Sequence, residues 1–152
     1  MQRCLEKGRY CQKLALARVI VGNIQHFIED PFGNYLIQNV LKIKNDEVVS
    51  RIFAFIAGDF IRLSKLKFSS NVIEKCIDSE FTEAKHIASI FAGTHANDDV
   101  TLIKLLGKDS RKQVKRIRVI VDELAIDQFG NYVLQKAVLA EVAWELKHNI
   151  LE

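Results

Sequence analysis

Three short segments of the chain each carry a pair of polar side chains that could meet the edge of a flat, hydrogen-bonding ligand. The segments are D-P-F-G-N-Y-L-I-Q-N-V-L, K-F-S-S-N-V-I-E-K-C-I and D-Q-F-G-N-Y-V-L-Q-K-A-V, at residues 30–41, 67–77 and 127–138. Residues four apart lie one turn above each other in an α-helix, so both members of a pair project from one face. We therefore expect three helices with solvent-facing pairs, which are Asn34 with Gln38, Ser70 with Glu74, and Asn131 with Gln135.

The chemistry of the pairs suits the edges of nucleic-acid bases. An amide offers both a donor and an acceptor, and uracil has an edge that alternates acceptors and donors in the same way. An ionised carboxylate such as that of Glu74 only accepts, and the Watson–Crick edge of guanine presents two adjacent N–H donors. The residue after the first member of each pair can stack on a base, which contributes about 1–3 kcal/mol per base. These stacking candidates are Tyr35, Asn71 and Tyr132.

Apolar residues within the same segments indicate which side of each helix is buried. They form equivalent stripes at Leu36, Ile37, Val40 and Leu41, at Val72, Ile73, Cys76 and Ile77, and at Val133, Leu134, Ala137 and Val138. An earlier apolar pattern over residues 13–28 recurs at three and four residues and predicts one amphipathic helix. Asp30 as a cap and Pro31 in the first turn predict that the next helix begins there.

The spacing of the segments indicates an internal repeat. Asn34 and Ser70 are 36 residues apart, and a step of 36 back from Gln38 reaches Gln2 in the related fragment Q-R-C-L. The apolar residues of the preceding helix keep the same register, since Ala17, Ile20, Ile24 and Phe27 correspond to Phe53, Ile56, Phe60 and Leu63. A fixed period in this range is typical of stacked repeats. The sequence therefore predicts an all-α solenoid with three recognition helices and a partial repeat at its start.

The last interval is longer, because Ser70 and Asn131 are 61 residues apart. Apolar offsets favour residues 111–124 as the lead helix of the last unit, whereas a competing alignment uses residues 83–91 and places the inserted segment after them. We divide the single domain, 1–152, into a partial repeat 1–10, repeats 11–45 and 46–79, an insertion at about 80–107, a last repeat 108–139 and a terminal cap 140–152.

Composition limits the class of protein. The chain has 152 residues, of which 49% are hydrophobic and 27% charged, so it can bury a core. There is no signal peptide, no membrane-length apolar run and no C-x-x-C spacing, which favours a reducing interior and no membrane partner. Cys4 and Cys76 occupy the same slot of the repeat, so we expect both to be buried. The net charge of +3 points weakly to an anionic partner.

Catalytic and metal-binding patterns are missing from the sequence. The four histidines show no metal-ligand spacing, and there is no Gly-rich phosphate loop, nucleophile elbow or carboxylate pair. We expect no enzymatic activity, no metal and no cofactor.

The triplets N-Y-x-x-Q, S-N-x-x-E and N-Y-x-x-Q, in two-helix units of 36 residues, resemble the last three repeats of the Pumilio (PUF) family. Proteins of that family bind one RNA base per helical repeat. The resemblance implies a right-handed superhelix in which the outer two side chains of a triplet contact the base edge and the middle one stacks. It also implies uracil for N-Y-x-x-Q and guanine for S-N-x-x-E. The family normally carries eight repeats, so the resemblance implies a fragment or a reduced member.

RNA runs antiparallel to the protein in that family, which assigns each base to a helix. The resemblance places Asn131 and Gln135 on the first uracil of 5'-UGU-3', with Ser70 and Glu74 on guanine. The second uracil falls to Asn34 and Gln38. Gln2 would belong to a fourth recognition set. The basic residues next to Gln2, Glu74 and Gln135 are the expected phosphate contacts, namely Arg3, Lys75 and Lys136.

The function implied by the resemblance is post-transcriptional regulation of messenger RNA. A monomer in the cytoplasm would bind single-stranded UGU elements in 3' untranslated regions, promote repression or decay, and recruit protein effectors on its convex face. Two alternatives stay open, which are a nucleolar Pumilio-like ribosome-assembly factor and a helical-repeat scaffold that binds proteins. The former would be expected to carry degenerate triplets, and the latter would not discriminate between RNA sequences.

Overall fold

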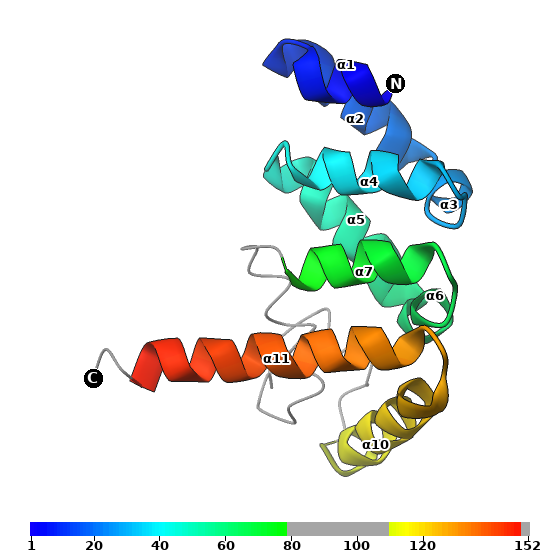
Figure 1. Ribbon diagram of the computed structural model, residues 1–152, viewed down its shortest axis with the longest axis vertical. Coiled ribbons are helices and arrows are strands. Elements are labelled where there is room, and N and C mark those ends of the chain that lie inside the picture. Colours follow the sequence, from blue (N-terminus) through cyan, green and yellow to red (C-terminus); the bar gives the residue numbers. More distant parts are fainter. Residues whose placement is uncertain (79–109, 150–152) are drawn as a thin grey trace.

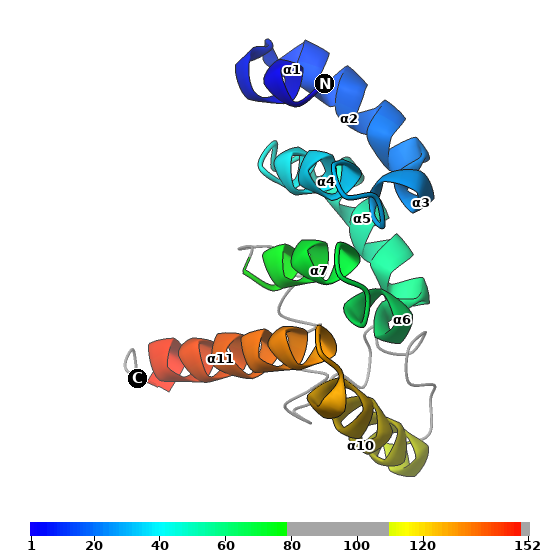
Figure 2. The ribbon, with the colours of Figure 1, turned by 45° about the vertical axis from the view of Figure 1, so that its right-hand side comes forward.

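The computed structural model describes residues 1–78 and 110–149, and the secondary structure within these ranges is helical, as predicted. The helices are α1 (Gln2–Lys7), α2 (Tyr10–Gly22), α3 (Ile24–Phe27), α4 (Gly33–Leu41), α5 (Asp46–Gly58), α6 (Phe60–Ser64), α7 (Ser69–Ile77), α10 (Ser110–Ile126) and α11 (Gly130–Asn149). Helices α1, α4, α7 and α11 lie side by side in one layer, and α2, α5 and α10 lie behind them (Figures 1 and 2). None of the described helices is long and apolar enough to cross a membrane.

The core lies between the two layers and consists of the apolar stripes. Ile37 and Ile73 are fully buried in α4 and α7, and they pack in one cluster with Ile20 and Ile56 of the second layer. In α11, Val133 and Ala137 are buried as predicted. The stripe thus fixes which face of each first-layer helix turns inward.

Val138 does not follow its counterparts, and the prediction that it is buried is wrong. Leu41 and Ile77 are each 4% exposed, whereas Val138 is 46% exposed. Helices α4 and α7 are each followed by another first-layer helix, α7 and α11 respectively. Within the described residues α11 ends the row, so the equivalent position meets no following helix.

Each of the first two lead segments is broken into two helices, so the single helix predicted over residues 13–28 is wrong. Helix α2 ends at Gly22 and α5 ends at Gly58, and the next residues, Asn23 and Asp59, have ψ angles of 30° and 37°. Glycine in a helix interior costs about 1 kcal/mol relative to alanine. The equivalent positions of the last unit hold valine and isoleucine, and α10 continues through them without a break.

Two aspartates cap the first-layer helices, but α4 begins at Gly33 rather than at Pro31 as predicted. Asp30 Oδ1 accepts hydrogen bonds from the backbone nitrogens of Phe32 (2.9 Å) and Gly33 (2.6 Å). Asp127 Oδ1 accepts from the backbone nitrogens two and three residues later in the same way, at 2.9 and 2.8 Å. Residues 30–32 therefore form the turn that leads into α4.

The first residues of α4 and α7 lie close to the helices that precede them, α3 and α6. A Cβ atom on Gly33 would lie 2.6 Å from the backbone oxygen of Phe27. Ser69 stands at the equivalent position of α7, and its Oγ donates a 2.6 Å hydrogen bond to the backbone oxygen of Leu63, the counterpart of Phe27. Glycine permits this close approach, and serine instead donates a hydrogen bond across it.

The last unit agrees with the favoured alignment, because α10 spans the segment expected to be its lead helix. The competing lead helix at residues 83–91 and the predicted insertion at 80–107 lie outside the described residues. The cap predicted at 140–152 is, through Asn149, the continuation of α11, which contains no Gly or Pro after Gly130. The boundaries assigned to the repeats stay predictions.

The two cysteines of the shared slot differ in exposure, so the prediction that Cys4 is buried is wrong. Cys76 is buried, and the loss of hydration raises the pKa of its thiol. Cys4 is exposed. Helix α7 is packed between α4 and α11, whereas α4 is the one first-layer helix that packs against α1 within residues 1–78 and 110–149.

Candidate nucleic-acid interface

The polar pairs lie on consecutive helices of the first layer. Asn34 and Gln38 are on α4, Ser70 and Glu74 on α7, and Asn131 and Gln135 on α11. Helix α7 packs directly against both α4 and α11 (Figure 1). Gln2 opens α1, which packs against α4. The solenoid therefore brings the predicted base-recognition residues into one row.

The amide pairs of α4 and α11 have the same internal geometry. Asn34 Nδ2 donates to the backbone oxygens of Asp30 and Pro31, both at 3.0 Å, and Asn34 Oδ1 accepts a 3.1 Å bond from Gln38 Nε2. In α11, Asn131 Nδ2 donates to the backbone oxygen of Asp127 at 2.7 Å, and Asn131 Oδ1 accepts from Gln135 Nε2 at 3.3 Å. The first amide is thus anchored to the turn before the helix and orients the second.

The first members of the pairs are more enclosed than expected. Asn34 and Ser70 are 1% and 3% exposed, so the prediction that both members face solvent is wrong for these two residues. They lie in the first helical turn, where their polar atoms face backbone carbonyls, and Ser70 Oγ donates to the oxygen of Lys67 at 3.4 Å. Gln38 and Glu74 are half-buried and Gln135 is exposed. The accessible polar surface therefore belongs mainly to the second members, and base contact by Asn34 and Ser70 stays a prediction.

Glu74 gives α7 a chemistry different from its neighbours. Partial burial raises the pKa of its carboxyl group, the positive charge of Lys136 lowers it, and the negative charge of Asp78 raises it further. Lys136 of α11 reaches across to α7, where its Nζ lies 3.1 Å from Asp78 Oδ1. An acceptor-only side chain therefore stands between two mixed donor–acceptor amides.

The stacking candidates are accessible. Tyr35 and Tyr132 are 52% and 58% exposed. Asn71 is also exposed, and its Nδ2 donates to the backbone oxygen of Lys67 at 3.1 Å, which holds its planar amide against the start of α7. The planar side chain next to each pair is therefore free to meet a ligand on the same layer.

Sequence reasoning missed one exposed aromatic residue beside the row. Phe32 is 81% exposed immediately before α4. Phe68 and Phe129 stand at the same position of the other two segments and are half-buried, and Lys67 Nζ lies 5.5 Å from the centroid of the Phe68 ring. The aligned phenylalanine in all three segments was the signal that could have identified this position.

The predicted phosphate contacts differ in their surroundings. Arg3 is exposed on α1, and Lys75 is exposed in the last turn of α7. Lys136 is engaged with Asp78, so its charge is partly neutralised. The same slot of α4 holds Asn39, which is buried. Phosphate contact by the three basic residues stays a prediction.

Comparison with known proteins gives consistent results. The model of the Pumilio-family RNA-binding repeat matches residues 23–57, 60–92 and 121–138. Pumilio homolog 12 of Arabidopsis thaliana is 30% identical over 138 residues, which are 91% of this chain and 19% of that protein. The chain spans about a fifth of the length of the first curated relatives that it matches.

Solved structures show the same fold. The RNA-binding domain of yeast Puf5p, bound to SMX2 RNA, superimposes with a TM-score of 0.63 at 33% identity, over 92% of this chain and 37% of that one. The Puf3 RNA-binding domain, bound to the Cox17 RNA 3' UTR recognition sequence, gives a TM-score of 0.52 at 26% identity, over 93% of this chain and 44% of that one. The repeat match over more than half of the residues, together with the helical solenoid, shows that the chain belongs to the Pumilio family of RNA-binding repeat proteins.

Proposed function

We propose that the chain recognises the single-stranded RNA sequence 5'-UGU-3', with α11, α7 and α4 each contacting one base in that order. The observation that carries the proposal is the repetition of one amide geometry on the two outer helices. Gln38 and Gln135 are each fixed by a hydrogen bond to an asparagine four residues earlier, at 3.1 and 3.3 Å. The helix between them presents a carboxylate instead.

The remaining hydrogen-bonding capacity of each glutamine suits uracil. Because one Nε2 hydrogen bonds within the pair, a second Nε2 hydrogen and the Oε1 atom are left for a ligand. These groups can pair with a carbonyl oxygen and the N3–H group of uracil. Glu74 offers two acceptor oxygens, which fit the two N–H donors on the Watson–Crick edge of guanine. The order of the helices then corresponds to U, G and U.

Stacking adds affinity that does not depend on sequence. Tyr35 and Tyr132 present exposed rings beside the outer glutamines. Base stacking on an aromatic side chain contributes about 1–3 kcal/mol per base. Asn71 offers a smaller plane, so the central base depends more on its edge contacts than the outer two bases do.

The proposed biological role is regulation of messenger RNA through UGU elements in 3' untranslated regions, leading to repression or decay. The family match supports RNA binding, and the related Puf3 domain binds a 3' UTR recognition sequence. In this proposal the protein is cytoplasmic and monomeric and binds RNA on the α4–α7–α11 layer. The opposite layer, which contains α2, α5 and α10, is available to protein effectors.

Competition binding with the full-length protein tests the proposal. An RNA with UGU should bind more tightly than the same RNA with the three bases scrambled, and Gln135→Ala should lose about 5- to 150-fold in discrimination at the first uracil, by analogy with bidentate contacts worth about 1–3 kcal/mol in DNA. Gln25→Ala is the matched control, because this exposed glutamine lies on α3, away from the row. Equal binding of UGU and scrambled RNA would instead favour a protein-binding scaffold.

A further inference from the structure

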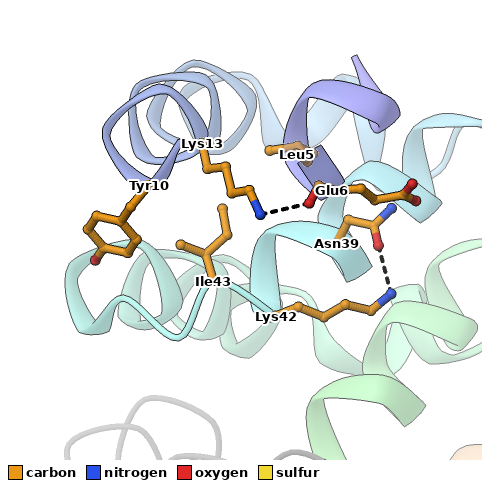
Figure 3. A pocket seen from close by; sticks show the side chains of 7 residues that line it. All are labelled: Leu5, Glu6, Tyr10, Lys13, Asn39, Lys42 and Ile43. Carbon is orange, nitrogen blue, oxygen red and sulfur yellow. Dashed lines mark hydrogen bonds between the residues drawn. The ribbon is translucent and has the colours of Figure 1, made fainter. Parts of the chain in front are cut away.

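A cavity of about 410 Å³ lies between α1, α2 and α4, next to the row of base-recognition residues (Figure 3). Lys42 lines it from α4 and Glu6 from α1, and these residues are 36 positions apart. Lys42 follows Gln38 by four residues, and Glu6 follows Gln2 by four residues. Residues four apart are neighbours on a helix surface. The cavity therefore begins one turn beyond the recognition positions of two adjacent helices.

Two lysines line the cavity without a carboxylate partner. Lys13 Nζ donates to the backbone oxygen of Glu6 at 2.8 Å, and Lys42 Nζ donates to Asn39 Oδ1 at 2.7 Å. Both acceptors are uncharged, and neither lysine forms an ion pair within residues 1–78 and 118–140. The carboxylate of Glu6 extends away from Lys13 (Figure 3). Two ammonium charges therefore remain available to an anion.

Asn39 adds a buried donor to the same wall. This residue is only 7% exposed, and its oxygen accepts from Lys42, whereas its amide nitrogen donates to no acceptor in the described part of the chain. A buried donor without a partner costs about 1–3 kcal/mol, so a ligand oxygen that accepts from it is favoured. The lining of the cavity thus carries three donor side chains, Lys13, Lys42 and Asn39, together with the side chain of Glu6.

The equivalent residues at the junction of α7 and α11 show how this cavity differs. Glu6 and Asn39 correspond there to Asp78 and Lys136, and these two residues form an ion pair at 3.1 Å. Asn39 is uncharged, so it cannot form the same ion pair with Glu6 between α1 and α4. The positive charges of the cavity come instead from Lys13 and Lys42.

We propose that this cavity binds a backbone phosphate of the RNA, namely the linkage on the 3' side of the last uracil of UGU. This inference rests on the proposed function, because the antiparallel path places that linkage between α4 and α1. Phosphate oxygens accept charge-assisted hydrogen bonds from Lys13 and Lys42 and a neutral one from the Asn39 amide. Leu5, Ile43 and Tyr10 complete the lining of the cavity.

The test uses the full-length protein and RNAs that carry one uncharged methylphosphonate linkage at a time. With wild-type protein, neutralising the linkage 3' of the last uracil should weaken binding about three- to tenfold, as expected for partly exposed charge contacts. With Lys13→Gln/Lys42→Gln the same RNA should show no further loss. The double variant should also reduce the slope of log Kobs against log salt by about 0.7 for one lost phosphate.

Two further variants separate a contact from a structural effect. Lys42→Gln alone should lose part of the sensitivity, because Lys13 still contacts the phosphate. This variant leaves the packing of the helices intact, since Lys42 Nζ is bonded only to Asn39 three residues earlier, whereas Lys13 also links α2 to α1. Lys7→Gln is the matched control, since this lysine is exposed on α1 and does not line the cavity. It should retain the wild-type response to the neutral linkage.

The outcomes distinguish this inference from the proposed function. If UGU is preferred over scrambled RNA but the lysine variants keep the wild-type sensitivity and salt slope, the phosphate site is wrong and base recognition stands. If UGU is not preferred, the proposed function fails and the inference falls with it. Binding of inorganic phosphate to these lysines, without sensitivity to the RNA linkage, would assign the cavity to a free anion and also overturn the proposal.

Discussion

Lys136→Gln is expected to make guanine recognition by α7 more sensitive to acid. Glu74 can accept both guanine N–H groups only when it is ionised. Partial burial raises the pKa of this carboxyl group, while Lys136 lowers it and Asp78 raises it, and no charged group of α4 or α6 contributes to the shift. The preference for guanine is therefore complete above the raised pKa and is lost as the pH falls through it. Removal of Lys136 moves this loss to higher pH, whereas Asp78→Asn moves it to lower pH.

The size of the shift follows from the exposure of the charges. Lys136 and Asp78 are 37% and 42% exposed, so solvent screens their effect on Glu74. Interactions between charges of this exposure are worth at most about 1 kcal/mol, and one pKa unit corresponds to about 1.36 kcal/mol. We expect each substitution to move the pKa of Glu74 by less than one unit. Below that pKa, the preference for UGU should then differ from wild type by about two- to fivefold.

Competition between UGU and UUU RNAs, measured from neutral to mildly acidic pH, tests whether the two substitutions shift the pH dependence of guanine preference. Lys75→Gln is the matched control, because Lys75 adjoins Glu74 on α7 but does not contribute to its pKa shift. Its pH profile should overlay that of the wild type. The reasoning is refuted if the Lys136 and Lys75 variants give the same profile, or if the Asp78 and Lys136 variants shift in the same direction.

Two predictions concern stability and are checked by chemical denaturation. Gly33→Ala should destabilise the fold by about 1–3 kcal/mol, because the new Cβ would lie 2.6 Å from the backbone oxygen of Phe27. A Cβ atom on Gly22 would have no atom within 4 Å, so Gly22→Ala should be neutral or should stabilise the fold by up to about 1 kcal/mol. Equal changes in the free energy of unfolding for Gly33→Ala and Gly22→Ala would contradict this account. Asp127→Ala should cost about 0.5–2 kcal/mol at neutral pH, since it removes the oxygen that caps α11. The hydrogen bond from Gly130 holds the pKa of Asp127 below its usual value, so this stabilisation is present above the unfolded-state pKa and is lost as the pH falls through the folded-state pKa. A difference between wild type and variant that does not shrink in acid would argue against the cap.

The repeat and the buried stripes could be predicted from sequence because both depend on periodicity. Ile37 and Ile73 hold the same place in two copies 36 residues apart, and both are fully buried. The same periodicity led to a wrong prediction at the break between α2 and α3. The apolar pattern continues through Gly22 and Asn23 into Ile24 and therefore predicted one helix, although the backbone turns at Asn23. Gly22 and Asn23 were a local signal for the end of a helix, but the prediction gave more weight to the apolar spacing.

Features that depend on how the backbone turns and how the helices pack were not accessible from sequence. The polar character of Asn34 predicted exposure, but the turn at Asp30 and Pro31 places two backbone carbonyls against its amide, so burial costs it no hydrogen bonds. The cavity next to Lys42 likewise requires three helices to be packed together, and Lys13 reaches it from the second layer. The sequence thus placed the candidate recognition residues on consecutive helices, whereas the burial of Asn34 and Ser70 was not predictable.

The central claim is that Ser70 and Glu74 make α7 select guanine between two uracil-binding helices. Replacing Ser70→Asn and Glu74→Gln gives α7 the pair found on α4, and the fold can accommodate it, since buried Asn34 occupies the equivalent place with its amide bonded to the preceding turn. In the full-length protein the double variant should prefer UUU over UGU, with a change in relative affinity of about 5- to 150-fold for a bidentate match worth about 1–3 kcal/mol. Competition binding with the two RNAs measures this directly. A double variant that still prefers UGU by the wild-type ratio would show that these residues do not select the base.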